Sequence, residues 1–448
     1  HDVSGTDSTA QHNAAYGIAA LDAITTGDHN TAIGSEAGSA NTTGYSNTFI
    51  GREAGKVNTE GYNNTFVGRG AGQSNIDADS NTFIGDLAGG AVTTGGANLM
   101  IGHLAGDNFD TETANLGIGK SALSGPIAGG EYNVAIGNGT LDLLTSGDNN
   151  VSVGYASGTE VTSGGSNTLV GYQAGAAITT GSNNVLIGNN AGDAMTDDSQ
   201  AVLIGGNAGS AATVSQLVGV GYGALNSVTT GLRNIAIGTD AGNNFDAEDD
   251  NLFIGFSSGS GSINGSEYNV AIGNYTLDAL TSADNNVAIG YQAGTAITTG
   301  GNNTIVGYDA ANTITDGTNN VFLGYRAAQS CTDVSNVVIG ADAARLGSTF
   351  QQNVIIGAAS TDSATFVGDK NVILGFESAR NATTFNNNVA IGFEAAQSAT
   401  EGNQNVIIGY QAGHDFTTAN DNIVIGYLAA DGYDTESHNL AIGRAALG

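Results

Sequence analysis

The chain has 448 residues, of which 70 are glycine, one is proline and none is tryptophan, and its formal net charge is −32. This composition excludes an ordinary globular domain, and the near absence of proline excludes collagen. Nucleic acids and anionic membranes are polyanions, so the negative charge makes both poor partners. No apolar run is long enough to span a bilayer, and the hydrophobic fraction of 40% argues against disorder.

A 17-residue repeat dominates the sequence. The segments NTAIGSEAG, NTFIGREAG and NTFVGRGAG, which begin at Asn30, Asn47 and Asn64, are aligned copies of one unit. If the residue after this Asn is position 1, about 26 coils can be aligned, and all of them have glycine at position 4. We therefore expect residues 1–13 to form an N-terminal partial coil and residues 14–448 to form a continuous solenoid.

The first half of each coil is predicted to be a short strand over positions 1 to 3. Position 3 is Ile, Val or Leu in every coil except the first, which has Tyr16, and position 2 is also apolar or small, as at Phe49 and Ile355. A strand that is apolar on both faces is expected to be buried on both faces, and a helix is excluded by the recurrent glycine.

The glycine at position 4 predicts a structural corner that needs a positive φ or a close backbone approach. Gly34, Gly51, Gly273 and Gly443 are representative of these predicted corners.

The second half of each coil, around AITTG, is predicted to be another short strand. Position 11 is often apolar, as at Ile24 and Ile314, and should point inward, and position 12 is most often Thr. A single coil cannot bury enough apolar area to offset the entropy of ordering it, so neighbouring coils must stack. The sequence therefore predicts an all-β parallel β-solenoid, or β-roll, of about 26 coils with two short strands per coil.

Two polar columns have structural and functional interpretations. The Asn column is expected to form ladders with itself and with turn backbone, in preference to binding a ligand. The Thr column is expected to add ladder hydrogen bonds, and the alternatives are an ice-binding or glycan-binding face. Asp110, Asp246 and Asp434 at position 12 interrupt the flat surface that ice binding needs.

No metal site, cofactor or catalytic constellation is expected. The acidic clusters DNFDTE (Asp107, Asp110, Glu112), FDAEDD (Asp246 to Asp250) and YDTE (Asp434, Glu436) could hold weak Ca²⁺, but solvated turn carboxylates are the favoured interpretation. Cys331 is predicted to be a buried small hydrophobe. The six histidines are expected to lie in different columns and to form no shared cluster.

Position 5 carries aromatic residues in many coils from residue 155 onward. Such a stripe predicts either a packing seam between copies of the chain or an exposed platform for sugars or protein ligands. The candidate ligand-binding residues are Tyr155, Tyr172, Tyr291, Tyr308, Tyr325, Tyr410 and Tyr427.

The run NVAIG, which begins at Asn133, Asn269, Asn286 and Asn388, resembles the head repeat of trimeric autotransporter adhesins, the YadA-like left-handed β-roll. It is also similar to repeats in some phage tail fibres. The resemblance implies homotrimers that pack through the apolar strand, secretion to a cell or virion surface, and adhesion to a glycan or matrix protein.

These observations together predict a non-enzymatic extracellular fibrous protein that acts as an adhesive head or fibre shaft on a cell or virion surface. The alternative is a structural filament subunit that assembles head-to-tail through uncapped solenoid ends, because the chain begins and stops within a coil. In the first case copies associate laterally as a homo-oligomer, and in the second they form a polymer.

Overall fold

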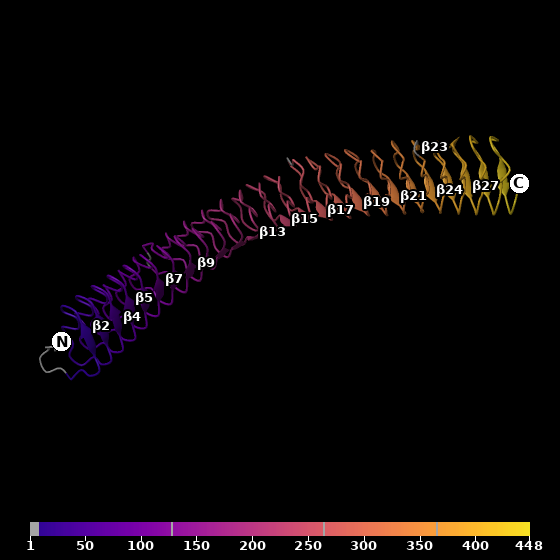
Figure 1. Cartoon of the computed structure of the whole chain (residues 1–448). Helices are drawn as coiled ribbons and strands as arrows, with labels where there is room; N and C mark the ends of the chain where they lie inside the picture. Colours follow the sequence, from indigo (N-terminus) through magenta and orange to yellow (C-terminus); the bar gives the residue numbers. More distant parts are fainter. Residues whose placement is uncertain (1–8, 127–128, 263–264, 364–365) are drawn as a thin grey trace. The chain divides into compact units, whose positions relative to one another are not determined.

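The computed structural model describes residues 9–126, 129–262, 265–363 and 366–448. The chain divides into two compact units, His1–Gly223 and Ala224–Gly448, and each is a parallel β-solenoid whose strands lie side by side as successive rungs (Figure 1). The predicted fold class is thereby confirmed. Within the described ranges there is no helix that could cross a membrane. Of the predicted partial coil 1–13, residues 1–8 lie outside the described residues.

Every strand in the first unit has three residues. The strands are β1 (Ala14–Tyr16), β2 (Thr31–Ile33), β3 (Thr48–Ile50), β4 (Thr65–Val67), β5 (Thr82–Ile84), β6 (Leu99–Ile101), β7 (Leu116–Ile118), β8 (Val134–Ile136), β9 (Val151–Val153), β10 (Thr168–Val170), β11 (Val185–Ile187), β12 (Val202–Ile204) and β13 (Val218–Val220).

The second unit continues the same pattern with strands of three residues. Its main sheet contains β14 (Ile235–Ile237), β15 (Leu252–Ile254), β16 (Val270–Ile272), β17 (Val287–Ile289), β18 (Thr304–Val306), β19 (Val321–Leu323), β20 (Val337–Ile339), β21 (Val354–Ile356), β22 (Val372–Leu374), β24 (Val389–Ile391), β26 (Val406–Ile408), β27 (Ile423–Ile425) and β28 (Leu440–Ile442). A separate pair is formed by β23 (Thr384–Asn386) and β25 (Glu401–Asn403).

The repeat sets the register of the sheets. Thr31 pairs with Thr48, and Ile33 pairs with Ile50, so that each position of a coil lies beside the same position of the next coil. The same in-register parallel pairing recurs at β17 and β18, where Ile289 lies opposite Val306. A column in the sequence alignment is therefore a physical ladder along each unit.

The second strand expected in every coil forms, among the described residues, only at β23 and β25. In the coil that begins at Ala14 the segment is a bend, and three consecutive amides share one acceptor. The N–H groups of Thr25, Thr26 and Gly27 all donate to the carbonyl oxygen of Thr42, at 2.9, 3.2 and 3.3 Å. A strand ladder alternates donors and acceptors, so three amides on one acceptor are the pattern of a bend in this coil.

The corner glycines have the backbone that the repeat predicts. Gly273 has a φ of 133°, and a Cβ atom placed on it would overlap the carbonyl oxygen of Gly290 in the next coil. Gly34 and Gly51 are in the same situation, whereas a Cβ on Gly443 would meet no heavy atom within 4 Å. Both reasons for glycine, the positive φ and the close approach, are therefore confirmed at the first three corners.

The core of each unit is narrow and is built from positions 2, 7, 8 and 11. Position 2 is buried in every described main-sheet strand after β1, and position 11 points inward as predicted, with Ile24 and Ile314 both at most 1% exposed. Side-chain size at positions 2 and 8 is complementary, since Phe49 is followed by Gly55 whereas Ala135 is followed by Leu141. This compensation keeps the packed volume of each coil similar.

Asparagine ladders close the coil. The backbone N–H of Asn47 donates to Oδ1 of Asn30 at 3.0 Å, and Nδ2 of Asn30 donates to the carbonyl oxygen of Gly44 at 2.8 Å. Both Asn side chains are buried, so these bonds satisfy polar groups that water cannot reach. The structural interpretation of the Asn column is confirmed.

Candidate functional site

An apolar surface recurs on the outer side of the rungs in each unit. We call it the outer apolar face and define it as positions 1 and 3 of the main-sheet strands. Position 3 is partly exposed: Ile33, Ile289 and Ile356 are 44%, 37% and 38% exposed, and in most other main-sheet strands the side chain is of intermediate exposure. The expectation that the strand is buried on both faces is therefore wrong for the single chain. Position 2 alone fills the narrow core, so the opposite side chains are left in solvent.

The outer apolar face is uncharged. In the described strands positions 1 and 3 hold Val, Ile, Leu or Thr, with Ala14 and Tyr16 in the first strand. A protein with a net charge of −32 thus keeps the outer apolar face of each unit free of carboxylates. Contiguous apolar surface of this kind marks a site of interaction in soluble proteins.

The predicted aromatic column lies next to this face, two residues after position 3 in each coil. All seven predicted tyrosines are exposed to solvent. Their exposed fractions range from 39% at Tyr291 to 58% at Tyr155. The column also includes Tyr222 at 59% and Phe376 at 46%.

The rings in the column stack on one another. The ring centroids of Tyr291 and Tyr308 are 5.2 Å apart with an interplanar angle of 15°, and Tyr308 and Tyr325 continue the stack at 5.5 Å. A second run includes Tyr410 and Tyr427 at 5.2 Å and 12°. Stacked rings cover each other's faces and present their edges, so the column offers edge contacts more than flat platforms for a sugar.

Tyr275 also joins the aromatic column, although the repeat alignment did not predict it. Tyr275 contacts Phe256 and Tyr291 edge-to-face, with centroid separations of 5.3 and 6.0 Å. It lies at position 6, because position 5 of its coil is Asn274. Alignment by column hides this contact, which appears only when neighbouring positions are compared.

A surface hollow of about 410 Å³ lies where the aromatic column of the first unit begins. It is lined by Tyr155, Asn138, Lys120 and Thr159, among others, and by Gly139, where an added Cβ would meet no heavy atom within 4 Å. Tyr155 stacks on Tyr172 on one side, at 5.6 Å. In this hollow a polar ligand could contact Tyr155 together with polar side chains.

The threonine column is occupied by hydrogen bonds within the solenoid. Thr42 Oγ1 donates to the carbonyl oxygen of Thr59 at 3.0 Å, and Thr162 Oγ1 donates to that of Thr179 at 3.1 Å. The interpretation as ladder hydrogen bonds is confirmed for these residues.

The acidic clusters use their glutamates as turn caps. Glu112 Oε2 accepts the N–H groups of Asp110 and Thr111 at 2.8 and 3.0 Å, and its Oε1 accepts that of Gly129 at 3.0 Å. Glu248 repeats the arrangement. At Glu436 the backbone hydrogen bonds hold the pKa of the carboxyl below its ordinary value. These contacts support the turn interpretation over Ca²⁺ binding.

Cys331 is fully buried, and burial raises the pKa of its thiol to about 12. The thiolate that would act as a nucleophile is therefore disfavoured, which agrees with the prediction of a small core residue.

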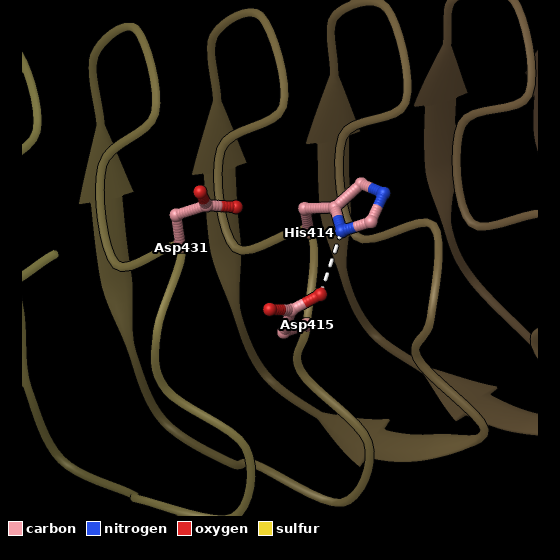
Figure 2. A group of neighbouring side chains, drawn as sticks. All are labelled: His414, Asp415 and Asp431. Atoms are coloured by element: carbon pink, nitrogen blue, oxygen red, sulfur yellow. Dashed lines mark hydrogen bonds and ion pairs between the residues drawn. The ribbon is translucent and has the colours of Figure 1, made fainter.

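The histidines differ from expectation in two places. His12, His29 and His438 all occupy position 16, so the expectation of different columns is wrong for these three, and the rings of His12 and His29 stack at 5.0 Å. His414 gathers with Asp415 and Asp431, and the ligand atoms of the three residues all lie within 4.8 Å of one another (Figure 2). This group holds a single histidine, so it is no cluster of histidines, but the contact of His414 with two carboxylates was not predicted.

Comparison with known proteins adds no family assignment. No protein-family model matches the chain, and no curated protein matches it. The class that the geometry defines is a parallel β-solenoid protein built from 17-residue coils.

Proposed function

We propose that the chain is a non-catalytic extracellular fibrous protein whose copies associate laterally to form an adhesive head or fibre shaft on a cell or virion surface. The observation that carries the proposal is the outer apolar face, whose position 3 side chains are 37% to 44% exposed at Ile289, Ile356 and Ile33. Covering this surface releases water from every rung, so association gains free energy along the length of the face.

A second copy of the chain is the partner that suits this face. The side chains on it recur at the spacing of stacked parallel strands, about 4.8 Å. Only a surface with the same spacing can place an apolar group opposite each rung. A second copy of the chain has this spacing because its rungs are the same. Stacked aromatic edges beside the face extend the same contact.

The proposed non-catalytic role is supported by how the polar columns are used. Asn30 and Thr42, and their equivalents in other coils, bond to the neighbouring coil and so hold the solenoid together. The adhesive role and the surface location rest on the resemblance of the NVAIG repeat to trimeric adhesin heads and phage tail fibres, both of which present β-rolls outside the cell.

Cysteine cross-linking between copies tests the lateral contact. In a Cys331→Ala background, Ile289→Cys places a thiol on the outer apolar face, and a short bismaleimide should link two chains at this position. The matched control is Thr299→Cys, an exposed residue of the same coil outside the face, which should give little dimeric product. Equal cross-linking at both positions would contradict association through the outer apolar face.

Electron micrographs of the purified chain separate the two fibrous roles. Discrete rods of uniform length are expected for an adhesive head. Fibres of indefinite length would instead favour the head-to-tail filament. A matrix-protein or glycan surface that captures the rods would add the adhesive function itself.

A further inference from the structure

The cluster formed by His414, Asp415 and Asp431 brings together one imidazole and two carboxylates from two adjacent coils. His414 and Asp431 both occupy position 9, 17 residues apart, and so lie on neighbouring rungs (Figure 2). Asp415 follows His414, and its Oδ1 lies 2.7 Å from His414 Nδ1. Among the described residues, the Asp431 carboxylate has no hydrogen-bond or ion-pair partner, although it faces this pair.

A chain of hydrogen bonds outside the cluster determines which His414 nitrogen carries a proton. The carboxylate of Glu377 can only accept, so Gln397 must turn its Nε2 toward it, and the two atoms are 2.7 Å apart. Gln397 Oε1 then faces His414 Nε2 at 2.9 Å. Because an amide oxygen also only accepts, Nε2 of His414 must be the protonated nitrogen.

The proton on Nε2 determines the state of the other ring nitrogen, Nδ1. In a neutral imidazole with its proton on Nε2, Nδ1 has a lone pair, and this lone pair points at the Asp415 carboxylate oxygen 2.7 Å away. Two electron-rich atoms at that distance need a positive charge between them, which is either a second proton or a metal ion. The nearby carboxylate of Asp431, and that of Glu394 at 4.0 Å from Nε2, increase the negative potential there.

We propose that His414 Nδ1, Asp415 and Asp431 bind a first-row divalent transition metal, with Zn²⁺ as the representative ion, and that the bound ion joins two adjacent coils. Imidazole nitrogen with carboxylate oxygen is a ligand set that Zn²⁺ accepts and that Ca²⁺ and Mg²⁺ disfavour. The Gln397 contact to Nε2 is the outer hydrogen bond that metal-binding histidines typically make. This inference is independent of the proposed fibrous function.

The geometry needs only a small rearrangement. Ligand atoms about 2.0–2.2 Å from one Zn²⁺ lie roughly 3–3.5 Å apart, whereas the present separations extend to 4.8 Å. The side chain of His414 is 26% exposed and that of Asp415 is 57% exposed, so the carboxylate can rotate inward. The same exposure lets water complete the coordination shell and gives the ion a path to the site.

The test is calorimetric titration of the full chain with Zn²⁺ at neutral pH. The expected result is one saturable site in the wild type that is lost in His414→Ala and in Asp431→Asn. Gln397→Leu keeps all three ligands but removes the outer hydrogen bond, so its affinity should fall about 10–100-fold. The matched control is His103→Ala, because His103 lies 3.6 Å from Asp86 but belongs to no group of three candidate ligands among the described residues, and its loss should leave binding unchanged.

Two further readouts make the outcome decisive. Co²⁺ bound in place of Zn²⁺ should give visible d–d absorption bands in the wild type that disappear in His414→Ala. Zn²⁺ should raise the melting temperature of the wild type but not that of His414→Ala, since a ligand stabilises the state that binds it. The proposal is overturned if the wild type shows no saturable Zn²⁺ binding, if His414→Ala binds as tightly as the wild type, or if Ca²⁺ competes equally well.

Discussion

Single residues at the corners determine whether adjacent coils can stack. Glycine at position 4 was predictable from the repeat, because a residue that recurs in every coil of a solenoid must meet the same demand each time. The structure shows that two demands coincide at Gly273, a φ of 133° and the carbonyl oxygen of Gly290 in the space a side chain would occupy. The substitution Gly273→Val therefore has to move backbone, which is costly.

We predict that Gly273→Val destabilises the chain by about 2–4 kcal/mol, since it combines a strained φ with an overlap against backbone. Gly443→Val carries the strain alone, because no heavy atom lies within 4 Å of the added Cβ, and should cost less. Thermal melts followed by circular dichroism measure both. Equal shifts for the two variants would show that the close approach contributes nothing.

The repeat columns do not predict every contact between single residues. The column that contains Asn30 and Asn47 repeats one residue type, so its structural role can be predicted from the sequence. The cluster at His414 cannot be predicted in this way, because its column holds Gln397, His414 and Asp431 in succession, and the chemistry arises from the mixture. The sequence signal for this cluster is the succession of polar residues at position 9 of three adjacent coils, which a search for histidines alone does not detect.

Within one coil, positions 2 and 8 act as a packing unit. A Cβ on Gly55 would contact the ring of Phe49 at 2.5 Å, whereas Leu141 occupies the same position where position 2 is Ala135. The backbone does not forbid leucine there, since φ is 57° at Gly55 and 50° at Leu141. Size, not conformation, therefore decides which pair of residues a coil can hold.

A double-mutant cycle on this pair tests the packing unit. Phe49→Ala should cost about 3–5 kcal/mol by leaving a cavity. Gly55→Leu should also destabilise, because the leucine meets the Phe49 ring. The double variant recreates the Ala135–Leu141 combination and should recover much of the summed loss. Strict additivity of the two effects, measured by chemical denaturation, would contradict size complementarity.

The 17-residue period correctly predicted the fold class and the register of the strands. It did not correctly predict the second strand, which is absent from most described coils. Its residues are good strand formers, and the column at position 11 points inward as predicted. What the sequence does not reveal is that Thr25, Thr26 and Gly27 direct three amides to one carbonyl oxygen. That choice depends on the path of the backbone between coils, which local propensity does not specify.

At the scale of the whole molecule, the excess of carboxylates makes stability depend on pH. Burial raises the pKa of Asp193, Asp278 and Asp107 above the ordinary value of 3.8. A raised folded-state pKa means that the folded chain binds the proton more tightly, so its contribution to stability is lost as pH rises through that pKa. The net charge of −32 acts in the same direction through self-repulsion.

We therefore predict a higher melting temperature as pH is lowered from 8 toward the window above 3.8 in which these groups take up protons. Asp193→Asn removes one such group, beside Glu160 on the same surface, and should raise the melting temperature at pH 8 and weaken the pH dependence. Asp22→Asn, which removes an exposed carboxylate, is the control and should leave the slope nearly unchanged. A melting temperature that falls steadily on acidification from pH 8 would contradict this.

The central claim is that copies of this chain cover the outer apolar face of one another. Its most direct test is the mass of the intact chain in solution, measured by light scattering over a range of micromolar concentrations. The account predicts a stable mass of three chains, or another small multiple of 44.5 kDa. A mass of 44.5 kDa at every concentration, with Ile289 and Ile356 accessible to solvent labels, would contradict it.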